Sequence, residues 1–247
     1  MITIDELKGY AKRNRLNLGQ AEIDYFQNIV LFILNQEYGN ELVFKGGTAL
    51  KKCYGLDRFS EDLDFNSSAE IDIHKIDVGL KRFAIDYTSK TEKYERGVKT
   101  TLRIKGPLYN GLANSTCKLI IDVSFRENNI LTPEIKKIGR FLEEIPSFDI
   151  VVMQEREIAS EKIRAISTRT KARDVYDLAF LIDKGIVIDI NLIKKKLKYY
   201  NEEWSTKLFT KKIDEKENIW ISELRPLIDT VPKFSEVKNK ILKNISG

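Results

Sequence analysis

Residues 44–65 constrain the fold of this chain more than any other stretch. The stretch begins at the end of a short apolar run, breaks at Gly46-Gly47, and ends in the tetrapeptide Asp-Leu-Asp-Phe at 62–65. A glycine pair before a helix lets the backbone approach phosphate oxygens, and the helix directs its first N–H groups at them. The stretch therefore predicts a strand, a glycine turn, a helix over residues 49–54 and a second strand.

The second strand carries two carboxylates. Side chains alternate along a strand, so Asp62 and Asp64 point to one face while Leu63 and Phe65 point to the core. Carboxylates this close repel each other unless a cation neutralises them, and oxygen ligands of this kind suit Mg²⁺ bound together with substrate phosphates. The alternative is an ordinary turn with surface aspartates. The glycines and the carboxylates together favour a site for a metal ion and a phosphate chain, in which Thr48 caps the helix or donates its hydroxyl.

A further acidic residue lies in the middle of an apolar strand. The run over 118–125 alternates, which places Asp122 on the face opposite Leu119, Ile121 and Val123. An aspartate in such a strand costs free energy unless a partner neutralises it. It either faces water on an edge strand or completes the metal site from a neighbouring strand.

Helical periodicity dominates both ends of the chain. Residues 1–40 predict helices, the main one over 21–36 ending at Gly39-Asn40, and 71–88 predicts one amphipathic helix. Other strands are expected over 98–104 and 148–153. Beyond about residue 150 the sequence turns helical and basic, so we predict domains 1–150 and 151–247, the second with helices over 155–168, 174–184, 193–200, 204–209, 219–228 and 237–245.

Composition excludes several classes of protein. The 247 residues carry 42 Lys+Arg against 37 Asp+Glu, a bias that is compatible with RNA or nucleotide but favours them only weakly. The basic run 194–196 could contact RNA, although the aromatic residues near it fit a core. Two cysteines are too few for a disulfide scaffold, and no signal-peptide pattern or membrane-length apolar run occurs. We therefore expect a cytoplasmic protein without a membrane partner. His74 is the single histidine, which leaves almost no material for Ser-His-Asp or zinc chemistry.

The motifs resemble those of a known enzyme family. Residues 46–50 (Gly-Gly-Thr-Ala-Leu), 54–56 (Tyr-Gly-Leu) and 58–65 (Arg-Phe-Ser-Glu-Asp-Leu-Asp-Phe) are similar to the first motif of the AbiEii/AbiGii-type nucleotidyltransferase toxins. Those toxins belong to the polymerase-β-like nucleotidyltransferase superfamily. Residues 161–165, Arg169 and 173–178 are similar to their later motifs.

The resemblance implies an α+β fold. A polymerase-β-like nucleotidyltransferase core, a mixed sheet with flanking helices, would be followed by a helical half that completes the active site. Carried onto this sequence, Lys162 would contact the triphosphate and Asp174 would be the functional acid of the helical half, with Asp177 as a further candidate. The full set of expected site residues comprises catalytic Asp62, Asp64, Lys162 and Asp174; metal-binding Asp62, Asp64 and Asp122; nucleotide-binding Lys45, Gly46, Gly47, Thr48 and Ser60; and the RNA or phosphate contacts Arg169 and Arg173.

The combined expectation is nucleotidyl transfer from a nucleoside triphosphate with two Mg²⁺ ions. By resemblance the acceptor would be the 3′ end of a tRNA, and the transfer would arrest growth. A neutralising antitoxin is expected as partner, in a system that can act as abortive defence against phage. Two alternatives stay open: an enzyme that transfers the nucleotide to a protein or small molecule, and a catalytically inactive nucleotide-binding regulator.

Overall fold

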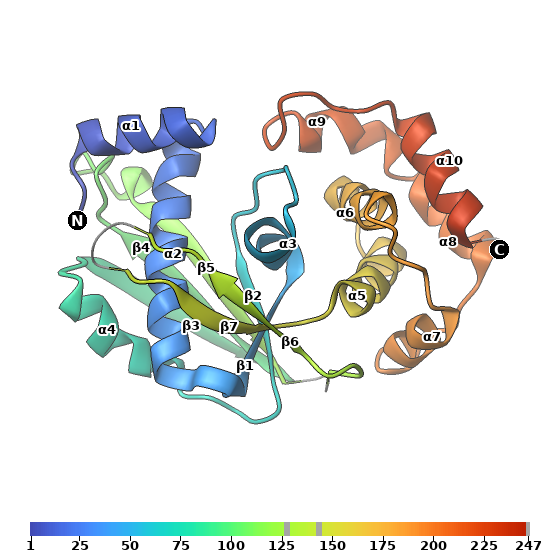
Figure 1. Ribbon diagram of the computed structural model, residues 1–247, viewed down its shortest axis with the longest axis horizontal. Helices are drawn as coiled ribbons and strands as arrows, with labels where there is room; N and C mark the ends of the chain where they lie inside the picture. The colour runs from blue at the N-terminus through green and yellow to red at the C-terminus, as the bar shows by residue number, and fades with distance from the viewer. Residues whose placement is uncertain (126–128, 142–144, 246–247) are drawn as a thin grey trace. The chain divides into compact units, whose positions relative to one another are not determined.

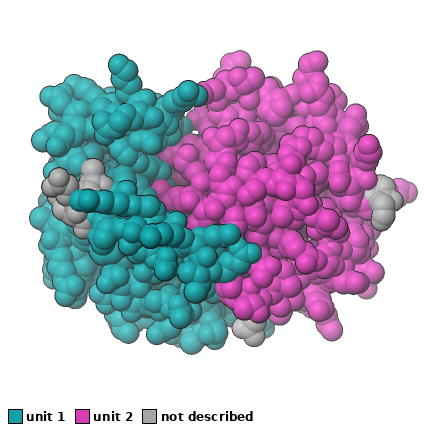
Figure 2. Space-filling model, in the orientation of Figure 1, with its two compact units in different colours: residues 1–49, 61–128, 134–152 teal, residues 50–60, 129–133, 153–247 magenta. Residues whose placement is uncertain are grey.

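The computed structural model describes residues 1–125, 129–141 and 145–245. Within these, the chain forms two compact units, which Figure 2 shows in different colours. Unit 1 comprises Met1–Ala49, Glu61–Asn128 and Glu134–Val152, and unit 2 comprises Leu50–Ser60, Asn129–Pro133 and Met153–Gly247. Segments 50–60 and 129–133 thus belong to the mainly helical unit although they lie before residue 150, the predicted boundary.

Unit 1 is built on one mixed sheet of seven strands, in the order β3-β4-β5-β2-β1-β7-β6 (Figure 1). The strands β2 and β5 run parallel, as do β1 and β7, and the other neighbours are antiparallel. This is the mixed sheet expected from the sequence. Its strands are β1 Leu42–Lys45, β2 Leu63–Ser67, β3 Tyr87–Tyr94, β4 Gly97–Ile104, β5 Cys117–Ser124, β6 Glu134–Ile138 and β7 Phe148–Val152.

The carboxylate strand lies in the interior of the sheet. β2 has β1 on one side and β5 on the other, and the register sets Asp64 opposite Asp122. The predicted alternation is confirmed, because Leu63 and Phe65 are buried while Asp62 and Asp64 are only half-buried. Since β5 is an interior strand too, Asp122 is not an edge-strand residue.

Helices cover the buried face of this sheet. The helix α2 (Leu18–Tyr38) packs on β5 and on α4 (Ile76–Arg82), and α1 (Ile4–Asn14) packs on α2 (Figure 1). Most side chains of α2 are buried, including Phe26, Ile29 and Val30, so apolar residues occur on most sides of this helix. It ends at Gly39, as the sequence predicted.

The predicted helix over 71–88 is wrong in its second half. A 3₁₀ turn at Ile73–Lys75 and α4 fill the first part, and β3 begins at Tyr87. Between them Ala84 has a φ of 50°, which a continuing right-handed helix does not allow. The strand β3 is an edge strand with mostly exposed side chains, so it lacks the apolar alternation that would have predicted it. The other edge strand, β6, is missed because its two apolar residues, Ile135 and Ile138, are three apart and so do not alternate.

Unit 2 is helical, as predicted for the second half. The helices over 155–168 and 174–184 are confirmed as α5 and α6, and the later ones lie within a few residues of their predicted bounds. The helix expected over 219–228 is shorter and ends before Pro226. In unit 2 the chain forms α5 Glu155–Thr168, α6 Ala172–Asp183, α7 Ile190–Lys198, α8 Thr206–Asp214, α9 Trp220–Leu224 and α10 Phe234–Ile245, while α3 Gly46–Tyr54 starts in unit 1 and continues into unit 2.

Candidate active site

The glycine turn brings a helix start against a carboxylate. The helix α3 begins at Gly46, directly after β1 and three residues earlier than predicted. Gly46 has a φ of 75°, and a Cβ at this position would lie 2.3 Å from Asp64 Oδ2. Both facts require glycine. The Asp64 carboxylate therefore lies against the first turn of α3, whose N–H groups make no bond within the helix.

Two hydrogen bonds hold the backbone just before β2. Thr48 is fully buried, and its Oγ1 donates to the carbonyl oxygen of Asp62 at 2.5 Å. Nε2 of Gln27, on α2, donates to the carbonyl oxygen of Glu61 at 2.9 Å. Two consecutive carbonyls are thus anchored from α3 and α2, which fixes where the carboxylate pair begins. A contact between the Thr48 hydroxyl and a phosphate would require the first of these bonds to break.

The three expected metal ligands come from two neighbouring strands of one sheet and from the residue that precedes one of them. Asp64 on β2 lies opposite Asp122 on β5, and Asp62 directly precedes β2. In this structure Oδ1 of Asp122 accepts a hydrogen bond from the Tyr94 hydroxyl at 2.6 Å. Within residues 1–125, 129–141 and 145–245, no three acidic, histidine or cysteine side chains are grouped closely enough to hold a metal ion. The donor set itself, carboxylate oxygens alone beside a helix N-terminus, has the chemistry that Mg²⁺ prefers together with phosphates.

Two of the other nucleotide-binding candidates lie at the glycine turn, and the third lies at the end of segment 50–60. Lys45 ends β1 and is half-buried, and Gly47 is buried in the first turn of α3. Ser60 is 7% exposed and ends the segment 50–60 of unit 2.

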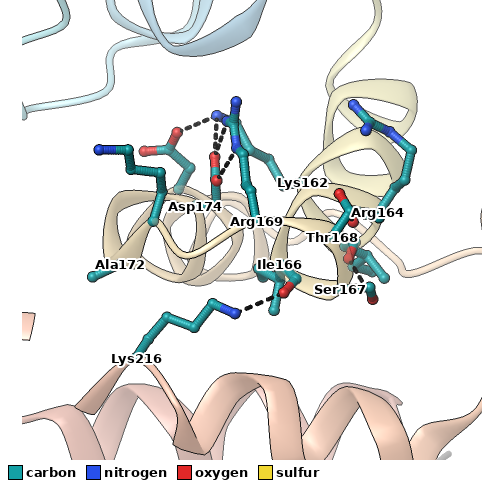
Figure 3. Close-up of polar contacts among 12 residues, drawn as sticks. Lys162, Arg164, Ile166, Ser167, Thr168, Arg169, Ala172, Asp174 and Lys216 are labelled. Atoms are coloured by element: carbon teal, nitrogen blue, oxygen red, sulfur yellow. Dashed lines mark hydrogen bonds and ion pairs between the residues drawn. The ribbon is translucent and has the colours of Figure 1, made fainter. Parts of the chain in front are cut away.

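The candidates on α5 and α6 form a cluster of alternating charges within unit 2. Nζ of Lys162 lies 3.0 Å from Asp174 Oδ1 and 2.6 Å from Asp177 Oδ2. Arg169 leaves the turn between the two helices and donates to Asp174 through Nε at 2.7 Å and Nη2 at 2.8 Å. Figure 3 shows Lys162 and Arg169 pointing toward Asp174. The spacing of the two aspartates, three residues apart on α6, had predicted a shared flank.

Arg58 completes this charge cluster, and sequence reasoning gave it no role. Its side chain is 1% exposed and grips Asp177 through Nε at 2.5 Å and Nη2 at 2.7 Å, while Nη1 donates to the carbonyl of Phe59 at 2.8 Å. The pair joins segment 50–60 to α6 inside unit 2. The sequence did contain a signal for such a partner. Two aspartates on a helix with a strong apolar face can be buried only if cations pair with them.

The charge cluster perturbs the titration of both aspartates. Burial by itself raises the pKa of Asp174, but the charges of Lys162 and Arg169 outweigh it and hold this pKa well below its usual range. Burial also raises the pKa of Asp177, but the charges of Arg58 and Lys162 outweigh this effect, so the pKa of Asp177 is lowered as well. Both carboxylates therefore stay ionised.

The charge cluster has an excess of positive charge, because three cations face two carboxylates. Lys162, the expected triphosphate contact, is 7% exposed at its side chain, whereas that of Arg169 is 50% exposed. Arg169 therefore presents the excess charge to solvent. Arg173, in the first turn of α6, is half-buried.

The lysine run on α7 is not a continuous basic surface. Lys196 is fully buried and lies 2.7 Å from Glu157 and 3.0 Å from Glu161. Only Lys194 and Lys195 of the run are exposed. The prediction that the run contacts RNA is thus wrong for Lys196, because its ammonium group is buried in ion pairs with two glutamates of α5.

Comparisons with known proteins agree with this geometry. A family model for the nucleotidyl transferase AbiEii toxin of type IV toxin–antitoxin systems matches residues 29–240. No curated protein matches in sequence. Among solved structures, the nucleotidyltransferase toxin MenT4 of Mycobacterium tuberculosis superposes with a TM-score of 0.64 at 19% identity, over 100% of this chain and 89% of that one. JHP933 of Helicobacter pylori gives a TM-score of 0.57 at 21% identity, over 92% of this chain and 90% of that one.

The structural matches share the fold, which confirms the expected nucleotidyltransferase architecture. The family match covers most of the chain, including the glycine turn, the carboxylate strand and the charge cluster. This chain therefore belongs to the AbiEii family of nucleotidyltransferase toxins of type IV toxin–antitoxin systems.

Proposed function

We propose that this chain transfers nucleotides from a nucleoside triphosphate to the 3′ end of a tRNA in the cytosol and thereby arrests growth. Family membership supports the transferase and toxin parts of this proposal. The observation that carries the chemistry is the position of Asp64, which lies against the start of α3 and opposite Asp122 on the adjacent strand, with Asp62 two residues before it.

Residues of unit 1 would bind the metal and the triphosphate. Asp62, Asp64 and Asp122 would hold two Mg²⁺ ions, which when bound stabilise the charge of the attacking and leaving oxygens. The backbone N–H groups of Gly46, Gly47 and Thr48 lie in the first turn of α3, where the helix dipole favours the β- and γ-phosphates. Lys45 and Ser60 would add further phosphate contacts.

Residues of unit 2 would act on the leaving group and the RNA. We propose that Lys162 is a preorganised cation that stabilises the negative charge developing on the leaving pyrophosphate. Asp174 is then a positioning residue, because it binds both Lys162 and Arg169 through hydrogen bonds. Arg169 and Arg173 would contact RNA phosphates, and the half-exposed guanidinium of Arg169 supports this.

Membership of a toxin–antitoxin family implies an antitoxin that neutralises the chain. We propose that release from this antitoxin during phage infection stops the growth of the host and so limits the phage. Co-expression of the gene encoded beside this one should restore growth. If growth stays arrested with every neighbouring gene, that part of the proposal is wrong.

Incubation with each of the four labelled triphosphates, in the presence of MgCl₂, tests the reaction. Total RNA and total cell protein are offered as separate acceptors, and the Asp64→Asn variant serves as the inactive control. Label should enter RNA of tRNA size with the wild type and not with the variant. Label in protein or in a small molecule would refute the RNA acceptor. If no acceptor is labelled, the remaining interpretation is a catalytically inactive nucleotide-binding regulator.

A further inference from the structure

A cavity of about 530 Å³ opens in unit 1 beside Asp62. Its walls are the first turns of α2, Glu61 and Asp62, Leu108, residues 114–116 and the first residues of β5. This volume lies within the range of sites that bind small molecules. Of the described residues assigned above to the triphosphate and the metal, Asp62 is the one that lines it.

The cavity wall combines apolar surface with a few polar groups. Ile23, Leu108 and Ile120 contribute apolar surface, while Asn114 and Lys118 add an amide and an ammonium group. Flat nucleobases bind in such an environment, because their faces pack on apolar side chains while their edges need hydrogen-bond partners.

The segment that forms one wall is fixed to α2. Glu22 is 4% exposed, and its Oε1 accepts a hydrogen bond from the Leu108 backbone N–H at 2.7 Å. A Cβ at Gly106 would lie 2.4 Å from the same oxygen and 2.7 Å from Phe26, so the backbone approaches α2 as closely as only glycine permits. The Leu108 end of this wall is therefore held by contacts within the protein.

The position of the cavity relative to α3 indicates which nucleoside it holds. In the sheet, β1, which leads directly into α3, lies on one side of β2, and β5 lies on the other. Among the described residues, the cavity lining includes β5 and none from β1 or α3. With the β- and γ-phosphates at α3, the cavity lies on the opposite side of the carboxylate strand from the leaving pyrophosphate.

In-line displacement fixes the place of the acceptor. The attacking hydroxyl oxygen bonds to the α-phosphorus on the side opposite the phosphorus–oxygen bond that breaks, pyrophosphate leaves with those bonding electrons, and the hydroxyl proton passes to water. The attacking hydroxyl must therefore come from the β5 side, where the cavity opens. The base of the incoming triphosphate is not subject to this in-line constraint.

We propose that this cavity binds the 3′-terminal nucleoside of the RNA acceptor and places its hydroxyl beside Asp62. The inference rests on the proposed function and adds a binding site to it. Lys118 lies in the wall next to that terminal ribose.

Cross-linking with periodate-oxidised total tRNA tests the site. Oxidation turns the terminal ribose into a dialdehyde, which condenses with a nearby lysine amine to an imine that borohydride reduces. Peptide mapping should find the cross-link at Lys118, and Lys118→Arg should abolish it. The matched control Lys90→Arg, at an exposed lysine of β3 outside the cavity lining, should keep it. Oxidised ATP, the competing probe, should not label Lys118.

Kinetics with a filled cavity give a second readout. Asn114 is an exposed lining residue, so Asn114→Trp should fill the cavity and raise the KM for tRNA about tenfold, as expected when one stacked base is displaced. The KM for the triphosphate should stay unchanged. Leu112→Trp, at an exposed residue of the same segment outside the lining, should change neither.

The outcomes separate this inference from the proposed function. Two results would overturn the inference alone while the wild type still transfers nucleotides to RNA. In the first, the cross-links lie away from Lys118. In the second, oxidised ATP labels Lys118 and Asn114→Trp raises the KM for the triphosphate. Absence of transfer to RNA by the wild type overturns the proposed function, and the inference falls with it.

Discussion

Replacing Arg58 with methionine should destabilise unit 2 strongly. Asp177 is fully buried and binds Arg58 through both carboxylate oxygens. Methionine keeps the apolar volume of the site but leaves the carboxylate with the Lys162 ammonium group, 2.6 Å away, as the cation beside it. Removal of one partner of a buried ion pair costs about 3–5 kcal/mol, and the Lys162 contact favours the lower end, about 3 kcal/mol. For a chain of 247 residues that unfolds in one transition, this loss lowers the Tm by about 6–12 °C.

Urea and thermal unfolding at pH 7, followed by circular dichroism, measure this loss. The matched control is Arg225→Met, because Arg225 is an exposed arginine of the same unit; surface replacements stay within about 0.5 kcal/mol. The double variant Arg58→Met/Asp177→Leu should recover most of the loss, since apolar residues often replace a buried pair without cost. If Arg58→Met unfolds like Arg225→Met, the pair does not stabilise the fold and the reasoning is refuted.

Three other changes test the carboxylates and the buried cations. Asp64→Asn keeps the side-chain volume but removes a charge, so it should abolish transfer of label to RNA without lowering the Tm; full activity would remove Asp64 from the site. Lys196→Met leaves two buried glutamates without this cation and should lower the free energy of unfolding in urea by about 3 kcal/mol. The control Lys195→Met, at an exposed lysine, should not change it measurably. The pKa values of Asp174 and Asp177 are lowered by folding, so their stabilisation is complete well above the unfolded value of about 3.9 and is lost as the pH falls below it; an unfolding midpoint in urea that is equal at pH 7 and pH 3 would contradict this.

Local patterns were sufficient to predict the carboxylate strand. The alternation of Asp62, Leu63, Asp64 and Phe65 depends only on the period of a strand, and the structure has it. The helices α5 and α6 were equally accessible, because their apolar residues recur at helical spacing. The glycine turn predicted a helix too, although its start directly at Gly46 depends on the approach of Asp64, which no local pattern contains.

Long-range pairing was not accessible in the same way. Arg58 and Asp177 are 119 residues apart, and the sequence offers each several possible partners. The burial of Lys196 was hidden by its place in a lysine run. A signal existed, since Lys196 falls at helical spacing with Leu192 and Ile193, on the buried side of α7. Edge strands such as β3 carry mostly exposed side chains and so show no apolar period.

The membership of segment 50–60 in unit 2 sets an order of events during synthesis. At about 5–20 residues per second, Asp177 emerges roughly 6–24 s after Arg58. We hypothesise that the segment stays protease-sensitive on the ribosome throughout that interval, although the glycine turn beside it has long been made. Limited proteolysis of nascent chains stalled before and after α6 would check this, since equal protection in both would contradict it. A toxin of this family whose charge cluster closes only when α6 is made would be inactive until translation has passed residue 183.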